Sequence, residues 1–421
     1  MRVVDKLKKK FSEEGVSWIP KSIKYRSYRW LNRRYFNHYK KILPIQENLI
    51  VLESQGDFSD NAWALYEYMK DNGYLEQYHI IWLVDHLAEA QKNHWPNTEF
   101  IVKNTDCKPN AQWAKVLATC KWFIYDHCDV IAPFVKRPEQ QVIYLSHGCG
   151  YKAAKGGDPT VNPTRDDMIT VTGPLAADYM SAFHSEPIEI MQITGYPRLD
   201  YFFKDNDQVA KAVNDRWHFD AYDKVIYWMP TFRQSVAKEI SEDYLNTQTG
   251  LPIFETEDSL RQFSDYLKKH NLLMVFKLHH LQANLPVFQK HFDNILVVHD
   301  EDLHDMGIQL YQFIPFADAM ISDYSSITVD YLLLDRPMIF TLDDYKQYEH
   351  SRGLYPKNAI DYMKGYHVYN QKELQDSLTE IVSGVDKYKA DRHAIMSEYH
   401  TYVDGNSSKR VLERIGVTLD K

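Results

Sequence analysis

Two histidines that follow apolar runs of the sequence are the residues best suited to proton transfer. His147 directly follows Val142–Ser146, and the glycines after it permit a tight turn and a close backbone approach to a ligand. An imidazole in this position can act as a general base, because its ordinary pKa of about 6.5 lies near neutral pH. His279 lies two residues after Lys277, and strand alternation would place both on one face, which suits a diphosphate. Taken alone, the segment around each histidine is also compatible with a structural turn.

Cations and hydroxyls that suit phosphate binding follow apolar runs, and Asp323 lies among them. They are Lys152, Arg198, Thr231, Arg233, Asp323, Ser325 and Ser326. An arginine presents a planar fork of donors that matches phosphate. Ser325 or Ser326 would cap the helix that follows, and the free amides and dipole of that helix would attract an anion. A helix end contributes only about 0.3–2 kcal/mol per charge, so a diphosphate would also need the cations. Taken singly, these sequences equally fit turns and a helix cap.

Short strands that alternate with helices must position these side chains. We predict two series of strands, rich in Val, Ile and Tyr and nearly continuous in apolar character, as strands buried on both faces are. The first series is Asn48–Glu53, His79–Val84, Trp122–Asp126, Val142–Ser146, Met168–Thr172 and Met191–Thr194. The second is Lys224–Met229, Leu272–Leu278, Ile295–Val298, Ala319–Ser322 and Met338–Leu342. Segments between them, such as Ser59–Lys70, Ser259–Lys269 and Ser326–Leu334, are predicted helices.

Alternation of strands and helices predicts an α/β fold with two doubly wound parallel-sheet domains that face each other across a cleft. Ligands in such domains bind at the carboxyl ends of the strands, where the candidates above lie. We expect a basic helical arm at residues 1–44, an N-terminal Rossmann-like domain at 45–205 and a C-terminal one at 206–421. The polar stretch Lys204–Asp223 would link the two domains.

The charge of the chain is distributed unevenly. Residues 1–41 carry 13 basic and three acidic side chains, so the overall net charge of −9 conceals an acidic body. An acidic body argues against nucleic acid as the main partner. The arm is also rich in aromatic residues, and rings beside cations suit the headgroups of an anionic membrane, where each Lys or Arg contributes about 1 kcal/mol. A solvated helical pair packed on the body is the alternative interpretation of the arm.

Several classes of protein are disfavoured by what the sequence lacks. No apolar run approaches the ~20 residues that span a bilayer, and no secretory signal is evident. The four cysteines, Cys107, Cys120, Cys128 and Cys149, form no CxxC pair, and we expect reduced thiols. Neither Asp166-Asp167 nor Asp343-Asp344 has the context of a metal site. We therefore expect chemistry without a metal or a cofactor.

In their order along the chain, these sequences resemble the CDP-glycerol glycerophosphotransferase family of teichoic-acid and capsule synthesis. The resemblance runs from Gly56–Asn61 to Tyr345–Pro356 and is strongest at Ser322–Ser326 with Asp330 and Arg336–Phe340. The sequences Gly195–Arg198, Pro230–Arg233, Lys277–His279 and Arg352-Gly353 are also similar. The resemblance implies a GT-B-type fold, with an acceptor-binding N-terminal domain and a CDP-donor-binding C-terminal domain.

Residue roles also follow from this resemblance. It implies that His147 is the base and that His279, Ser325 and Ser326 hold the donor diphosphate. Further donor-site candidates are Arg198, Thr231, Arg233, Lys277 and Asp323, and Lys152 and Arg352 are additional cleft candidates. The chain departs from the family pattern around both histidines. Ser146 replaces the usual Trp, Cys149-Gly150 replaces Thr-Pro, and His280 replaces Pro.

The implied activity is transfer of glycerol-phosphate or ribitol-phosphate from a CDP-polyol to a hydroxyl of a lipid-linked teichoic-acid or capsule precursor, with release of CMP. Such an enzyme would work peripherally on the cytoplasmic face of the bacterial membrane. A GT-B glycosyltransferase that uses a nucleotide-sugar is the alternative enzyme. A catalytically silent membrane organiser of polymer assembly is the alternative from a different class. The sequence leaves open primase or polymerase action, the acceptor identity and the oligomeric state.

Overall fold

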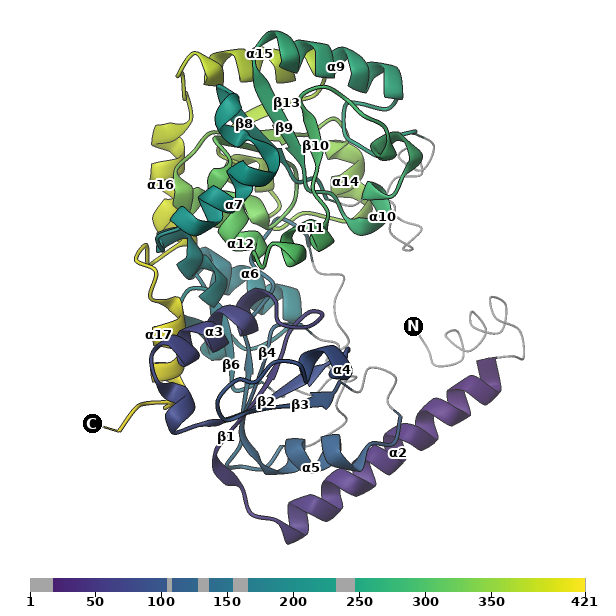
Figure 1. Cartoon of the computed structure of the whole chain (residues 1–421), viewed down its shortest axis with the longest axis vertical. Coiled ribbons are helices and arrows are strands. Elements are labelled where there is room, and N and C mark those ends of the chain that lie inside the picture. Colours follow the sequence, from purple (N-terminus) through teal and green to yellow (C-terminus); the bar gives the residue numbers. More distant parts are fainter. Residues whose placement is uncertain (1–17, 104–107, 128–135, 154–165, 232–246, 421) are drawn as a thin grey trace. The chain divides into compact units, whose positions relative to one another are not determined.

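The computed structural model describes residues 18–103, 108–127, 136–153, 166–231 and 247–420. Its strands form two sheets, and the strand pairs run parallel, which confirms the predicted α/β class (Figure 1). The chain divides into two compact units. Unit 1 comprises Met1–Ser146, Arg165–Ile169 and Leu412–Lys421, and unit 2 comprises His147–Thr164 and Thr170–Val411. The domain boundary at 205/206 stays a prediction, and the expected linker Lys204–Asp223 contains helix α7 (Asp207–Trp217).

The first sheet has seven strands in the order β3-β2-β1-β4-β5-β6-β7. They are β1 (Gln46–Glu53), β2 (His79–Val84), β3 (Thr98–Val102), β4 (Cys120–Tyr125), β5 (Gln141–Tyr144), β6 (Met168–Val171) and β7 (Met191–Ile193). The chain winds outward from β1 through β2 and β3, then returns beside β1 with β4. The strand order thus reverses between β1 and β4, where such sheets bind ligands.

The second sheet repeats this arrangement in unit 2, with the order β10-β9-β8-β11-β12-β13. Its strands are β8 (Lys224–Trp228), β9 (Leu272–Phe276), β10 (Ile295–Val297), β11 (Ala319–Ser322), β12 (Met338–Thr341) and β13 (Tyr366–Val368). Here the order reverses between β8 and β11. Val225–Trp228 of β8 are buried, as expected for a strand covered on both faces.

Helices precede, connect and follow the strands of the two sheets. They are α2 (Trp18–Ile42), α3 (Asp60–Asp71), α4 (Leu87–Ala90), α5 (Ala111–Thr119), α6 (Pro174–His184), α7, α9 (Glu257–Lys269), α10 (His280–Ala283), α11 (Asp300–Asp305), α12 (Leu310–Phe313), α13 (Ile327–Tyr331), α14 (Tyr345–Ser351), α15 (Gln371–Val382), α16 (Lys389–Tyr399) and α17 (Ser407–Arg414). Thr256 begins α9 with a capping box, which satisfies free amides at the helix start.

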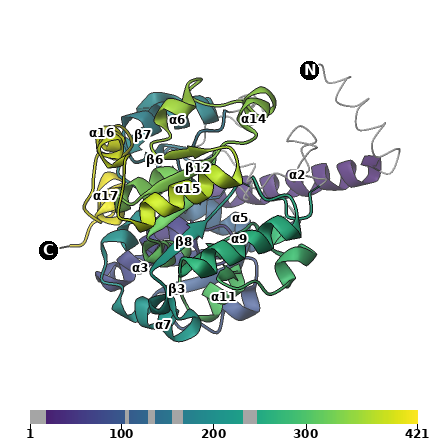
Figure 2. The same ribbon diagram turned by 90° about the horizontal axis from the view of Figure 1, so that it is seen from above.

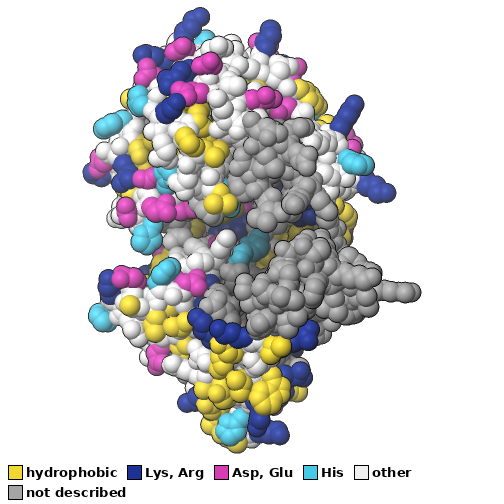
Figure 3. Space-filling view, turned by 90° about the vertical axis from the view of Figure 1, so that its right-hand side faces the viewer, with side chains coloured by type: hydrophobic (Ala, Val, Ile, Leu, Met, Phe, Trp, Pro, Cys, Tyr) yellow, Lys and Arg dark blue, Asp and Glu magenta, His cyan; other side chains and the backbone are white. Residues whose placement is uncertain are grey.

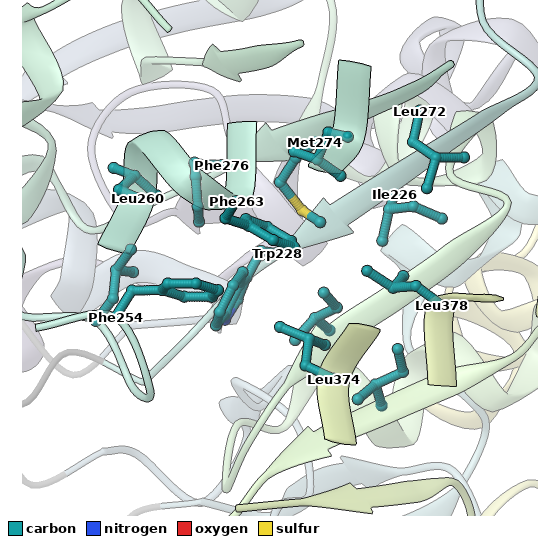
Figure 4. Close-up of a cluster of buried hydrophobic side chains, with 14 of the residues drawn as sticks. Ile226, Trp228, Phe254, Leu260, Phe263, Leu272, Met274, Phe276, Leu374 and Leu378 are labelled. Carbon is teal, nitrogen blue, oxygen red and sulfur yellow. The ribbon is translucent and has the colours of Figure 1, made fainter. Parts of the chain in front are cut away.

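The core of unit 2 lies where β8 and β9 face α9 and α15. Trp228 and Phe276 of the strands meet Phe254 and Phe263, with Leu374 on the other side (Figure 4). Phe254 and Phe263 lie 4.6 Å apart between ring centroids. Burial of a side chain of this size contributes about 1.5–3 kcal/mol, so this cluster holds the carboxyl ends of β8 and β9 in place.

Two strands end two residues earlier than predicted. β5 ends at Tyr144 and β9 ends at Phe276. Strand alternation therefore does not reach Lys277 and His279, and the expectation that it places them on one face is wrong. Both residues instead belong to the turn between β9 and α10.

Helix α2 packs on α5 within unit 1, and its N-terminal half extends beyond α5 (Figures 1 and 2). Asn32 joins the two elements, because its Nδ2 donates to Lys108 O (3.0 Å) and its Oδ1 accepts from Asn110 N (2.9 Å). Hydrophobic and basic side chains gather on this side of the molecule (Figure 3). Across the described ranges, no helix is long and apolar enough to cross a membrane.

Candidate active site

Where the strand order of the second sheet reverses, Asp323 joins the segments that follow β8 and β11. This buried carboxylate follows β11 and accepts the backbone N–H of Thr231, which follows β8, on both oxygens at 3.0 and 2.9 Å. Ser322 Oγ adds a bond to Met229 O (2.5 Å). Two predicted donor-site residues, Thr231 and Asp323, thus meet directly. Arg233 lies outside the described residues.

Ser325 and Ser326 lie at the start of α13. Ser326 occupies the N-cap position, but its backbone is helical (φ −61°, ψ −22°) and its side chain makes no cap bond. The expectation of a serine cap is therefore wrong for this helix, since a capping residue needs an extended backbone. Within the part of the chain that the structure describes, no hydrogen bond involves either serine hydroxyl. Both side chains are partly exposed, so the hydroxyls can bind a ligand.

The loop that carries His147 packs against this pair of serines within unit 2. A Cβ added at Gly150 would lie 3.3 Å from the N, Cα and Cβ atoms of Ser326. Gly148 has φ +110°, and a Cβ there would lie 3.6 Å from Ser326 Cβ. The approach is tight at Gly150, where a side chain would require Ser326 to shift, whereas the Gly148 distance to Ser326 is an ordinary contact. His147 is partly exposed, and the loop that carries it therefore packs against one of the predicted phosphate-binding serines.

Arg198 is buried rather than presented to a ligand, with an exposed fraction of 3%. Its Nη2 donates to His147 O (2.9 Å) and to Asp330 Oδ2 (2.8 Å). Its Cζ lies 4.5 Å from the ring centroid of Tyr311. The role of Arg198 as a donor ligand stays a prediction.

After β9, the side chain of His279 is exposed and that of Lys277 is buried. Lys277 Nζ lies 2.6 Å from Asp300 Oδ1, and its side chain is 6% exposed. His279 is exposed, and its Nδ1 accepts the N–H of Leu281 (3.3 Å). With Nδ1 used as an acceptor, a neutral imidazole would carry its proton on Nε2, which suits a hydrogen bond to a phosphate.

Lys152 and Arg352 lie on neighbouring segments of unit 2. Lys152 pairs with Leu354 in an antiparallel bridge, and Tyr355 N donates to Tyr151 O (2.9 Å). Both cations are partly exposed. Their part in the site stays a prediction, but the structure brings the two predicted residues into one region.

The turn before His147 is held from inside unit 1. Ser146 is buried and has φ +64°, an uncommon value for a residue with a side chain. Asn61, also buried, donates from Nδ2 to Leu145 O (3.1 Å) and Ser146 O (2.9 Å). Asp126 fixes the chain around Asn61 by accepting Gln55 N (3.0 Å) and Ala62 N (2.9 Å). Asp126, which follows β4, thus accepts backbone N–H groups in unit 1 as Asp323 does in unit 2.

Two buried groups near the His147 loop, Cys149 and His400, have pKa values that burial shifts toward the neutral form. Burial raises the pKa of the Cys149 thiol well above its ordinary value, so this departure from the family pattern offers no thiolate. Burial also lowers the pKa of His400, whose Nε2 donates to Val329 O (2.8 Å) in α13. His400 therefore supports the helix that begins after Ser326.

The paired aspartates considered as metal ligands have other partners. Asp344 accepts from Tyr324 Oη (2.9 Å), and Asp343 accepts from Ile253 N (3.1 Å). Asp166 accepts from Tyr125 Oη (2.8 Å). In the described segments, no group of three or more His, Cys, Asp or Glu side chains is arranged to hold a metal ion.

Three residues of the site were not among the predicted ones. Asp330 and Tyr311 hold Arg198, and Asn61 holds the turn before His147. Asp330 and Asn61 lie inside the sequences that carry the family resemblance, which was the available signal. Asn61 lies 85 residues from Ser146, and Asp330 lies 132 residues from Arg198, so spacing alone could not assign their roles.

Two doubly wound parallel sheets, with a histidine, serines and an aspartate gathered at strand ends, define a nucleotide-dependent transferase of the GT-B type. The chain belongs to the CDP-Glycerol:Poly(glycerophosphate) glycerophosphotransferase family, whose model matches residues 35–416. The predicted family, fold class and enzyme class are therefore confirmed.

Similar proteins agree with this assignment. A teichoic acid glycerol-phosphate transferase of Staphylococcus aureus is 28% identical over 88% of this chain and 93% of its own length. A teichoic acid ribitol-phosphate primase of Bacillus spizizenii is 26% identical over 89% and 92%, respectively. The solved structure of the wall teichoic acid polymerase TagF has the same fold, with a TM-score of 0.71 at 20% identity over 99% of this chain and 98% of TagF.

Proposed function

We propose that this chain transfers glycerol-phosphate or ribitol-phosphate from a CDP-polyol to a hydroxyl of a lipid-linked polymer precursor and releases CMP. The observation that carries the proposal is the packing of the His147 loop on Ser326, with 3.3 Å between a Cβ built at Gly150 and the Ser326 backbone. A base and two phosphate-binding hydroxyls then lie within reach of one substrate. Family membership supports the donor class, and a TagF variant has been soaked with CDPG.

In the proposed reaction, the acceptor hydroxyl attacks the phosphorus that bears the polyol. The bond from this phosphorus to the bridging oxygen breaks, and CMP leaves with the electron pair. His147 takes the proton of the attacking hydroxyl and later returns it to solvent. A positioned base of this kind contributes about 10²–10⁴-fold to the rate, equivalent to about 3–5 kcal/mol of barrier.

Neutral donors surround the proposed diphosphate position in unit 2. The hydroxyls of Ser325 and Ser326 donate to phosphate oxygens, and Nε2–H of His279 donates to the CMP phosphate as charge develops there. The ion pair of Lys277 with Asp300 reduces the positive charge that this lysine offers. Hydrogen bonds aimed at developing charge can supply most of such stabilisation, since they need no rearrangement during the reaction.

The lipid-linked acceptor and the membrane belong to the same proposal. Helix α2 has exposed Ile23, Trp30 and Ile42 among exposed cations, and the Arg34 guanidinium lies 4.8 Å from the Trp30 ring centroid. Such a helix suits the surface of an anionic membrane, where each cation contributes about 1 kcal/mol. The chain would then work on the cytoplasmic face of the bacterial membrane. Loss of binding to anionic vesicles in a Trp30→Ala, Arg33→Gln, Arg34→Gln variant, with turnover on a short acceptor kept, would support this placement.

The transfer itself is tested by CMP release from CDP-glycerol and CDP-ribitol in turn, with a lipid-linked teichoic-acid acceptor. We expect release with at least one donor, and a loss of about 10²–10⁴-fold in His147→Ala. His291→Ala is the matched control, because its side chain is 89% exposed and pairs with Asp293, which is not among the site residues. Release only from a nucleotide-sugar, or an unchanged rate in His147→Ala, would contradict the proposal.

A further inference from the structure

The surroundings of Arg198 differ from those of a substrate-binding arginine. One nitrogen, Nη2, bonds both to His147 O and to the buried carboxylate of Asp330. The guanidinium is flanked by aromatic rings, with Cζ at 4.5 Å from the Tyr311 centroid and 5.3 Å from that of Tyr196. Tyr311 Oη also donates to Asp330 Oδ2 at 2.5 Å. Arginine stacks on rings and forms directional ion pairs in this way where it holds structure together.

Asp330 connects Arg198 to Ser325 and Ser326, because it pairs with the arginine and lies in the helix that follows the two serines. It lies in α13, four residues after Ser326, and its exposed fraction is 0%. Among the described residues, its second oxygen, Oδ1, has no hydrogen-bond partner. The arginine is therefore the group that neutralises this buried carboxylate, and a buried ion pair holds its geometry because separation leaves an uncompensated charge.

We infer that Arg198 and Asp330 are positioning residues, which fix the backbone of His147 relative to Ser325 and Ser326. The inference rests on the proposed function and changes the role of Arg198 from a donor ligand to a support of the base. The connection runs from His147 O through Nη2 to Asp330 Oδ2, and from there along one turn of α13 to Ser326. Reacting groups must be held closely, since a displacement of about 1 Å can reduce turnover about 100-fold.

The two roles of Arg198 predict different kinetics. Loss of a donor ligand would raise KM and Kd for the CDP-polyol. Loss of a positioning residue lowers kcat and leaves KM for the donor nearly unchanged. Asp330→Asn separates the roles further, because this variant retains the shape of the side chain but weakens the ion pair. If Arg198 were a donor ligand, Asp330→Asn would release it toward the donor and kcat would not fall.

The experiment compares Arg198→Lys, Arg198→Gln and Asp330→Asn with a matched control, Arg216→Gln. Arg216 also pairs with an aspartate, Asp302, and lies over an aromatic ring, but its side chain is 41% exposed. We expect kcat for CMP release to fall about 10- to 100-fold in the three test variants, with KM for the donor within about twofold. The control should match the wild type. A rise in donor KM with kcat retained overturns the inference.

Hydrogen exchange measured by mass spectrometry provides a readout that does not need turnover. We expect faster exchange at the amides of Gly148–Tyr151 in Arg198→Lys and Asp330→Asn than in the wild type, and no change in Arg216→Gln. Exchange equal to the wild type in both test variants overturns the inference. If the wild type releases no CMP, the proposed function fails while the exchange result still decides the inference. Arg198→Lys retains the charge, so it remains informative where Arg198→Gln does not fold.

Discussion

Replacement of Gly148 by alanine should disrupt the support of His147 without removing any functional group. The glycine has φ +110°, and an added Cβ would lie 2.8 Å from Nη2 of Arg198, closer than non-bonded atoms approach. That nitrogen makes the bonds to His147 O and Asp330, so it cannot move without weakening them. The added methyl group should therefore weaken the hydrogen bonds that Arg198 makes to His147 O and to Asp330.

Two effects should lower the free energy of unfolding of Gly148→Ala. A non-glycine residue in a sparsely populated backbone conformation costs about 1–3 kcal/mol. A methyl group forced into a filled space costs a further ~1–3 kcal/mol. The free energy of unfolding should therefore fall by about 2–6 kcal/mol in Gly148→Ala. Gly384 is the matched control, because it has φ +80° but no atom within 4 Å of its would-be Cβ, and its replacement should cost only about 1–2 kcal/mol.

Urea unfolding and CMP release measure the two effects separately. We expect Gly384→Ala to retain the wild-type kcat, and folded Gly148→Ala to lose about 100-fold, because the base is displaced. Equal destabilisation of the two variants would show that backbone strain alone acts at Gly148. Wild-type kcat in folded Gly148→Ala would refute the reasoning that this contact positions His147.

Three further predictions concern the supports of the site. Asn61→Ala should reduce kcat and lower the free energy of unfolding by about 1–3 kcal/mol, because the buried carbonyls of Leu145 and Ser146 both lose the amide donor, as CMP release and urea unfolding would show. Asp200→Ala removes the acceptor of two backbone N–H groups at the start of α17, each at 2.8 Å, and should cost about 1–3 kcal/mol, measured against replacement of the exposed Asp205. Burial lowers the pKa of His400 in the folded chain below the ordinary 6.5, so the unfolded chain takes up a proton first as pH falls. The free energy of unfolding should thus decrease below about pH 6.5, and this decrease should be smaller in His400→Gln.

Most strands could be predicted because their signal is local. Eleven strands were expected from apolar runs, and each has a counterpart in the structure, with ends displaced by a few residues at most. β3 was missed because it lies at the sheet edge, where only Ile101 of its five residues is buried and the apolar run is short. β13 also lies at a sheet edge, and the polar His367 interrupts its short apolar run. Both failures reflect strands whose pairing depends on a neighbour rather than on their own composition.

Residue types at strand ends also identified the reaction class without the structure. The order of the sequences around His147, Arg198, Lys277 and Ser325 is a property of the chain alone, and so is the resemblance that it carries. The sequence by itself therefore determined the family, the two-sheet architecture and a set of candidate residues at the carboxyl ends of strands.

Only the tertiary structure decided which of those candidates are exposed and which are buried. Arg198 and Lys277 looked alike in the sequence as phosphate-binding cations, but both are buried and ion-paired. Their partners, Asp330 and Asp300, are 132 and 23 residues away along the chain. Burial and charge pairing depend on neighbours in space, which the order of residues along one strand does not encode. The distinction between a residue that binds substrate and one that holds another residue in place therefore arises only when the chain has folded.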